Sequence, residues 1–154
     1  MIFATTGAQL PFDRLVKMLD DIAPTIDEKI VAQFIQSTYR PRNLDVTGFV
    51  SPADFGKYVA NARIVVAHAG MGSIISALEL GKPVVVLPRL ASMGEHRNDH
   101  QVATAERLTE LGYVFYAHDY DELSAFIRAE SLPPLRKIST QASSRLVQAI
   151  INEI

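Results

Sequence analysis

The stretch that decides the fold spans residues 64–101 and reads IVVAHAGMGSIISALELGKPVVVLPRLASMGEHRNDHQ. It begins with an apolar strand at residues 64–67, turns through small residues at 68–73 and continues as a helix that must end at Gly81. A second apolar strand follows at residues 84–87 and leads into a loop rich in polar side chains. A strand, a glycine turn, a helix and a strand in this order predict one βαβ unit of a parallel sheet.

The same alternation continues on both sides of this unit. Apolar residues recur at helical spacing from Phe12 to Ile22, after a first strand and a turn at Gly7, and Ser51 has the sequence context of a helix N-cap. Parallel strands need crossover connections, and every crossover here has helical periodicity. The sequence therefore predicts an α/β fold, a single Rossmann-like, doubly wound parallel sheet within one domain of residues 1–154. Its six strands are expected at residues 1–6, 30–35, 46–50, 64–67, 84–87 and 113–116.

The last helix is expected from about residue 138 to the end of the chain. An apolar stripe runs along it and either packs on the core or docks on another subunit. The stripe consists of Leu146, Val147, Ile150, Ile151 and Ile154.

The composition excludes several classes of function. The chain has 154 residues and no cysteine, which rules out disulfides, thiolate metal sites and a cysteine nucleophile. Its 15 basic and 17 acidic residues leave it near neutral, so it lacks the charge excess that would favour nucleic acid or anionic lipid. We expect no export signal, because the first residues have the pattern of a strand with no basic region before it, and no apolar run in the sequence approaches the ~20 residues that span a bilayer. We expect a soluble protein that reaches a membrane only through a partner.

Polar clusters at residues 68–73 and 89–101 both follow strands of the predicted sheet. Ligands of such sheets bind at this edge, where the carboxyl ends of the strands meet the amino ends of the helices. The free N–H groups at residues 70–73 and the positive end of the helix dipole suit an anion, most simply a phosphate.

The residues of the glycine turn each have two interpretations. His68 either makes a structural hydrogen bond or contacts a phosphate or ribose. Gly70 and Gly72 either serve the turn or let backbone amides approach a ligand closely. Ser73 either is the N-cap of the helix or donates a hydrogen bond to a phosphate, and the two roles are compatible.

The second cluster is equally ambiguous. Asn98 and Gln101 have the N-x-x-Q spacing of a capping pair. Alternatively, His100 and Gln101 face the same crevice as His68 from the first turn of a helix and bind a sugar hydroxyl or a diphosphate. Arg89 and Arg97 either are solvated charges or bind a carboxylate or phosphate through their planar guanidinium groups.

Two further motifs are discounted. Residues 70–75 begin like the dinucleotide motif G-x-G-x-x-G, but Ile75 occupies the third glycine position and the motif follows the fourth strand instead of the first. Asp119 and Asp121 resemble a metal-binding D-x-D pair, but they begin a helix, where acidic residues are favoured by the dipole. No Ser-His-Asp arrangement and no histidine pair with metal-ligand spacing is recognisable.

Several motifs resemble the family 28 glycosyltransferases. They are TTGAQ at residues 5–9, PFDRL at 11–15, HAGMGS at 68–73 and GEHRNDHQ at 94–101, of which the last is the most specific. The resemblance covers nearly the whole chain. It is closest to the donor-binding subunits of two-chain transferases, namely those of bacterial exopolysaccharide and capsule assembly and the two-chain GlcNAc transferase of the dolichol pathway.

The resemblance implies a metal-independent GT-B hexosyltransferase that is divided between two polypeptides and uses no cofactor. This chain would be the C-terminal half, which binds the UDP-sugar. A membrane-anchored partner subunit would bind a polyprenyl-diphosphate-linked acceptor and supply the general base, so this chain would hold no catalytic residue and be active only with its partner. The protein would be cytoplasmic and peripheral to the inner face of the cytoplasmic membrane, and it would act in exopolysaccharide or capsule synthesis.

The same resemblance assigns roles to individual residues. Phe49 and Val50 would border the uracil, and a loop that includes Gly7, Ala8 and Gln9 would close the phosphate side. The diphosphate and the sugar hydroxyls would be bound by residues of the two later motifs, which are His68, Gly70, Met71, Gly72, Ser73, Asn98, His100 and Gln101.

The chain departs from the family at Ser76, which stands where related transferases often place a carboxylate for the ribose. Glu79 lies a turn further along the helix and cannot simply replace it.

Two other functions stay open at this point. A stand-alone nucleotide-sugar epimerase or isomerase would need a catalytic base in this chain, and a non-catalytic nucleotide-binding module would bind UDP without discriminating sugars. The sequence does not identify the sugar, although Arg89 and Arg97 near the sugar end suggest UDP-glucuronate.

Overall fold

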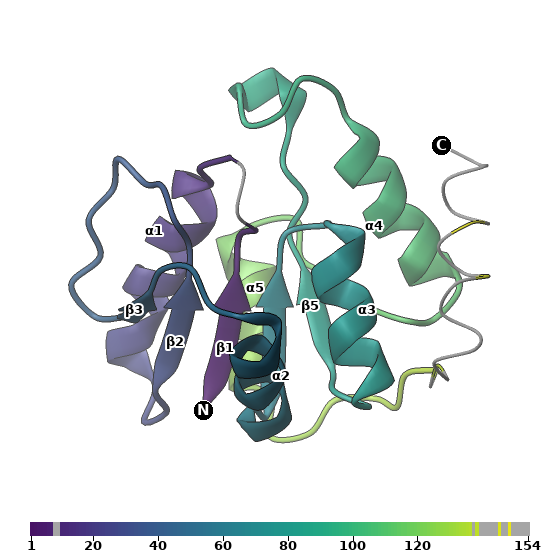
Figure 1. Cartoon of the computed structure of the whole chain (residues 1–154), viewed down its shortest axis with the longest axis horizontal. Helices are drawn as coiled ribbons and strands as arrows, with labels where there is room; N and C mark the ends of the chain where they lie inside the picture. The colour runs from purple at the N-terminus through teal and green to yellow at the C-terminus, as the bar shows by residue number, and fades with distance from the viewer. Residues whose placement is uncertain (8–9, 137, 139–144, 146–147, 149–154) are drawn as a thin grey trace.

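The computed structural model describes residues 1–7, 10–136, 138, 145 and 148, which form an α/β fold around one parallel sheet (Figure 1). The strands are β1 (Ile2–Thr5), β2 (Ile30–Gln33), β3 (Asp45–Thr47), β4 (Ile64–Ala67), β5 (Val84–Val86) and β6 (Phe115–Tyr116). The helices are α1 (Asp13–Ile22), α2 (Pro52–Asn61), α3 (Met71–Glu79), α4 (His100–Glu110) and α5 (Tyr120–Arg128). The predicted α/β sheet of six strands is confirmed.

The centre of the sheet is β1, because the strand order is β3-β2-β1-β4-β5-β6. Ile2 pairs with Ile30 of β2 on one side and with Ile64 of β4 on the other, both in parallel. The order of the strands reverses between β1 and β4. In a doubly wound sheet this reversal opens a crevice at the carboxyl ends of the two strands.

Helices cover both faces of the sheet (Figure 1). In β1, Ile2 and Ala4 join the core cluster that includes α1 and α5, whereas Phe3 joins the cluster of α2, α3 and α4. Phe3 stacks on Tyr58 of α2 with ring centroids 5.2 Å apart. Because both faces are buried, the inner strands β1, β2, β4 and β5 have mostly apolar sequences that do not alternate with polar residues.

Every strand except β4 is shorter than predicted, since a strand extends only as far as its neighbour pairs with it. β2 ends at Gln33, whose partner Thr47 is the last residue of β3. β3 covers Asp45–Thr47 instead of residues 46–50, which leaves Phe49 outside the ladder. β6 has two residues, the two that pair with β5.

Helix starts agree with the sequence wherever a side chain caps the helix. Ser51 accepts a hydrogen bond from the N–H of Asp54 at 3.2 Å, and Asp119 accepts one from the N–H of Glu122 at 2.9 Å. The interpretation of Asp119 as a helix start is thereby confirmed. The predicted final helix lies outside the described residues. None of the helices in the described ranges is both long enough and apolar enough to cross a membrane.

A buried carboxylate fixes the connection between β2 and β3. Asp20 on α1 is 3% exposed and accepts hydrogen bonds from the Tyr39 hydroxyl and from the N–H groups of Arg42 and Asn43. The hydrogen bond to Asp20 raises the pKa of Tyr39 to about 12. Three donors of this connection therefore depend on one acceptor side chain.

The variant Asp20→Ala is expected to lower the free energy of unfolding by about 2 kcal/mol or more, because three donors lose their acceptor. Asp21→Ala is a matched control. Among the described residues its carboxylate pairs with Lys17 alone, on the exposed side of α1, and such pairs contribute about 0.3–0.5 kcal/mol. Urea unfolding measures both variants, and equal losses would show that Asp20 is not the anchor.

Candidate functional site

A cavity of about 410 Å³ lies over the carboxyl ends of β1, β4 and β5. The sequence predicts a crevice at the fourth and fifth strands, and the observed strand order extends it to β1. The predicted residues that line it are Gly7, His68, Gly70, Met71, Gly72, Ser73, Arg89 and Gln101, with Thr6 of the loop after β1. Leu10 and His96 also line it and were not predicted as site residues.

The amino end of α3 forms one wall of the cavity. Gly70 occupies the N-cap position and offers no side chain to cap the helix. The N–H groups of the first turn have no acceptor within the helix, and they carry the positive end of its dipole. Ser73 is the third residue of α3, so the prediction that it is the N-cap is wrong. This wall suits an anion.

The His68 ring fits between two glycines. A Cβ on Gly70 would lie 2.1 Å from the ring atom Cε1, and a Cβ on Gly7 would lie 2.8 Å from Nε2. Gly7 also has φ +78, a conformation that L side chains rarely adopt. Gly7 and Gly70 therefore leave room for the His68 ring, which lies between them.

Two donors approach Nδ1 of His68. Arg89 Nη1 lies 2.9 Å from it and Gln101 Nε2 lies 3.2 Å from it, while Gln101 Oε1 accepts the backbone N–H of Arg89. Burial, aided by the positive charge of Arg89, lowers the pKa of His68 to about 4. The ring is thus neutral near pH 7, and the two donors at Nδ1 favour the tautomer with its proton on Nε2, the atom beside Gly7 and Gly70. His68 offers the cavity one uncharged N–H donor.

Arg89 is 3% exposed, so its interpretation as a solvated charge is wrong. Its Nη2 donates to the carbonyls of Thr6 and Leu10, both at 2.6 Å. Because Nη1 approaches His68, both terminal nitrogens already contact the protein. Arg97, in contrast, is exposed.

Glu95 of the GEHRNDHQ motif has a structural role. Its two carboxylate oxygens accept Nε and Nη2 of Arg14 at 2.9 and 3.0 Å, and Oε1 also accepts the N–H of Leu90. Arg14 belongs to the PFDRL motif. Two motifs 81 residues apart in sequence therefore form one ion pair that holds the loop between β5 and α4.

Asn98 and Gln101 do not form the predicted capping pair. Asn98 Oδ1 accepts the N–H of His100, while the Gln101 side chain turns to His68 and Arg89 instead. His100 is exposed, and neither Asn98 nor His100 lines the cavity. Their contacts with a ligand stay predictions.

Three other predicted site residues lie away from the lining. Ser76 donates its hydroxyl to the carbonyl of Gly72. Phe49 is 79% exposed and follows Gly48, whose carbonyl accepts Gln33 Nε2 at 3.3 Å, and Val50 is half-buried. Contacts of Phe49 and Val50 with a base stay predictions, as does that of Ser76 with a ribose. Ala8 and Gln9 lie outside the described residues.

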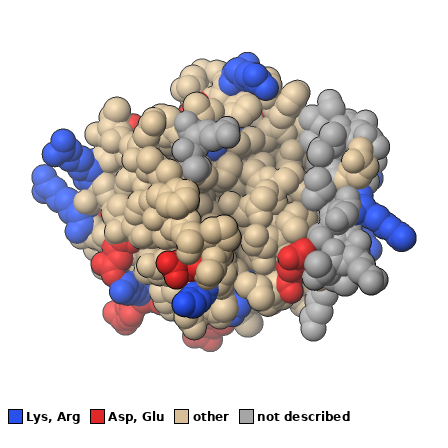
Figure 2. All heavy atoms as spheres, in the orientation of Figure 1, with Lys and Arg blue, Asp and Glu red and all other residues tan. Residues whose placement is uncertain are grey.

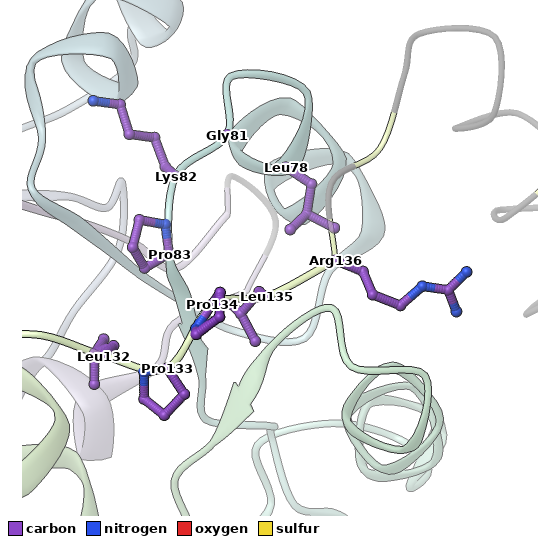
Figure 3. A pocket seen from close by; sticks show the side chains of 9 residues that line it. All are labelled: Leu78, Gly81, Lys82, Pro83, Leu132, Pro133, Pro134, Leu135 and Arg136. Carbon is purple, nitrogen blue, oxygen red and sulfur yellow. The ribbon is translucent and has the colours of Figure 1, made fainter.

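A second cavity, of about 200 Å³, lies between the amino end of β5 and residues 132–136 (Figure 3). Three prolines line it, and the side chains of Lys82 and Arg136 extend away from it (Figure 3). Apart from these two cations, the residues that line it have no polar side chain. Within the described ranges, no three His, Asp or Glu side chains are grouped as metal ligands. On the face drawn in Figure 2, Lys and Arg side chains lie at the left, top and right edges and, beside acidic side chains, along the lower part, and they form no continuous basic patch across it.

Comparison with known proteins gives consistent results. Residues 1–153 match the glycosyltransferase family 28 C-terminal domain. The UDP-N-acetylglucosamine transferase subunit ALG13 of Eremothecium gossypii is 30% identical over 149 residues, which cover 94% of this chain and 71% of that protein. ALG13 of Candida albicans is 29% identical over 89 residues, which cover 58% of this chain but only 29% of that protein. A solution NMR structure of ALG13 has a TM-score of 0.65 at 21% identity, over 99% of this chain and 96% of that one, and shows that the fold is shared.

The packing of His68 is tested by Gly70→Ala, whose new Cβ would lie 2.1 Å from Cε1 of the ring. We expect a loss of about 1–3 kcal/mol in stability and shifted NMR resonances of the His68 ring. Gly56→Ala on α2 is the control, because a Cβ there meets nothing within 4 Å and alanine favours a helix by about 0.5–1 kcal/mol. Thermal unfolding compares the two. A Gly70→Ala protein with wild-type stability and resonances would contradict this description of the ring.

Proposed function

We propose that this chain, which belongs to the glycosyltransferase family 28 C-terminal domains, binds the donor in a UDP-sugar glycosyltransferase that acts with a partner subunit. The observation that carries the proposal is the cavity at the switch point, where the amino end of α3 and Nε2–H of His68 converge. An uncapped helix end and an N–H donor on one side of a cavity provide what a diphosphate requires.

Glycosyl transfer breaks the bond between the anomeric carbon and the β-phosphate oxygen of the donor, and a hydroxyl oxygen of the acceptor bonds to that carbon. Negative charge grows on the departing diphosphate. The N–H groups of Met71, Gly72 and Ser73 and Nε2–H of His68 are fixed before the reaction, so they stabilise this charge with little reorganisation. The acceptor hydroxyl must lose its proton to a general base. We place that base on the partner subunit.

The proposed donor is UDP-N-acetylglucosamine, since the relatives are named as subunits of a UDP-N-acetylglucosamine transferase. The expectation of UDP-glucuronate loses its main support, because both terminal nitrogens of Arg89 contact protein atoms. The relatives described above also give no support to a role in bacterial exopolysaccharide or capsule synthesis. A dolichol-type pathway agrees better with them.

We further propose that the acceptor is linked to a polyprenyl diphosphate and that a membrane-anchored partner binds it. The protein would then work in the cytoplasm, at the membrane surface, through that partner. A stand-alone epimerase is less favoured, because it needs a base at the cavity. The titratable residues among those that line the cavity are His68, Arg89 and His96, and Nδ1 of His68 already accepts hydrogen bonds.

UDP binding tests the site. His68→Ala removes one N–H donor to a charged group, so the affinity for UDP is expected to fall about tenfold or more in calorimetry. His118→Ala is the matched control, since this exposed histidine contacts Glu122 and does not line the cavity. Equal affinity of wild type and His68→Ala would place the diphosphate elsewhere, and no UDP binding by the wild type would remove the proposal.

The choice of sugar is tested by titrating the chain with UDP-N-acetylglucosamine, UDP-glucose and UDP-glucuronate. We expect the tightest binding for the first and no preference for the third. Transfer to a polyprenyl-diphosphate acceptor is expected only when the partner subunit is present. Tighter binding of UDP-glucuronate would contradict the donor assignment, and turnover by this chain alone would contradict the two-subunit proposal.

A further inference from the structure

We infer that Arg89 is a positioning residue that selects the Nε2–H form of His68 and joins this ring to both ends of the loop after β1. The inference rests on the proposed function, in which that N–H binds the donor diphosphate. It differs from the role expected from the sequence, in which Arg89 would contact the sugar itself.

The first step is the direction of the hydrogen bond between the two side chains. A guanidinium has donors and no acceptor, and it keeps its proton in proteins. Arg89 Nη1, 2.9 Å from Nδ1 of His68, can therefore only donate. A neutral imidazole has one N–H, so a donor held at Nδ1 moves that N–H to Nε2. Gln101 Nε2, at 3.2 Å, approaches the same atom and favours the same form.

The second step is the contact with the loop. Nη2 of Arg89 donates at 2.6 Å to the carbonyl of Thr6 and at 2.6 Å to the carbonyl of Leu10. These two residues flank Gly7, whose missing side chain leaves room for the His68 ring. One planar side chain thus links the loop to the ring, and both line the same cavity.

The third step concerns charge. Arg89 is 3% exposed, and within the described residues it forms no ion pair, since Glu95 pairs with Arg14 instead. The carbonyls of Thr6 and Leu10, the ring of Phe12 with its centroid 5.0 Å from Cζ, and the nearby charge of Glu95 partly compensate the guanidinium, while Nε has no partner among the described residues. Burial of a cation that has no carboxylate as a direct partner is unfavourable while the cavity holds no anion. An anion in the adjoining cavity would offset that penalty.

The surroundings of His68 make the effect measurable. Arg89 and His96 are the titratable groups that act on the ring, whereas the loop after β1, the start of α3 and α4 present Thr6, Gly7, Gly70 and Gln101. Burial and the charge of Arg89 both lower the pKa of His68. Substitution of Arg89 should therefore change the pKa of His68, although His68 itself is left intact.

The experiment is long-range ¹H–¹⁵N NMR of the His68 ring in the full chain, without ligand, across a pH titration. In the wild type we expect Nδ1 unprotonated and Nε2 protonated at pH 7, with a pKa of about 4. In Arg89→Met we expect a mixture of the two tautomers and a pKa nearer the ordinary value of about 6.5. Arg42→Met removes an exposed cation on the connection between β2 and β3 and should change neither.

Two outcomes would overturn the inference. One is a wild-type ring with its proton on Nδ1, which requires no variant and is decisive even if Arg89→Met does not fold. The other is a folded Arg89→Met protein with the wild-type tautomer and pKa. Arg89→Lys adds a third measurement, because one amine cannot reach Nδ1 and both carbonyls together. The Arg89→Lys protein should keep the fold and show both tautomers of His68. If His68 in this variant were found only in the Nε2–H form, the two terminal nitrogens of Arg89 would not be needed to select it.

Calorimetry with UDP separates this inference from the proposed function. If both hold, Arg89→Met binds UDP about tenfold more weakly or worse, as expected for one lost hydrogen bond to a charged group. If the wild type has the Nε2–H tautomer but does not bind UDP, the proposed function fails and the role of Arg89 survives. If the wild type binds UDP but has the His68 proton on Nδ1, the proposed function survives and the role of Arg89 fails.

Discussion

The position of β1 between two parallel neighbours is the constraint on which the structure depends. Its backbone pairs with β2 on one side and β4 on the other, so the connections on the two sides leave in opposite directions. Helices then cover both faces of the sheet, and the crevice opens at the carboxyl ends of β1 and β4. Thr6 and Gly7 after β1, His68 after β4 and Arg89 after β5 meet there because each follows directly on a strand or within three residues of one.

The sequence predicted the sheet well because the signals for it are local. Residues 64–67 are apolar, bounded by a helix end and a glycine turn, and β4 has the predicted bounds. Residues 46–50 show the limit. Their apolar side chains predicted a strand, but the length of β3 is fixed by pairing with β2, and no local pattern encodes that pairing. Phe49 consequently lies outside the sheet.

The candidate site divides in the same way. The glycine turn and His68 were predicted because a strand followed by a glycine turn and a helix is a local pattern. The environment of Arg89 was not, since its partners Thr6 and Leu10 lie 83 and 79 residues away in sequence. Gln101 was expected to bind a ligand or cap a helix, and it contacts His68 across 33 residues. His96 was passed over although its motif was recognised, because nothing in the spacing shows which motif residues face the cavity.

At the proposed diphosphate site, Arg89 and His68 would combine a charge with a directed donor. Two adjacent cations would repel each other, and only the imidazole can relieve this by losing its proton, since arginine stays charged. Burial, which is the larger cause, and the charge of Arg89 lower the pKa of His68 to about 4, so His68 is the neutral member and its protonation state does not change near neutral pH. The charge comes from Arg89 and the end of α3, and the direction comes from His68. A single histidine with a pKa near 7 would carry a positive charge in only a fraction of the molecules at that pH. With Arg89 and His68 together, the positive charge and the N–H donor are both present throughout the physiological pH range.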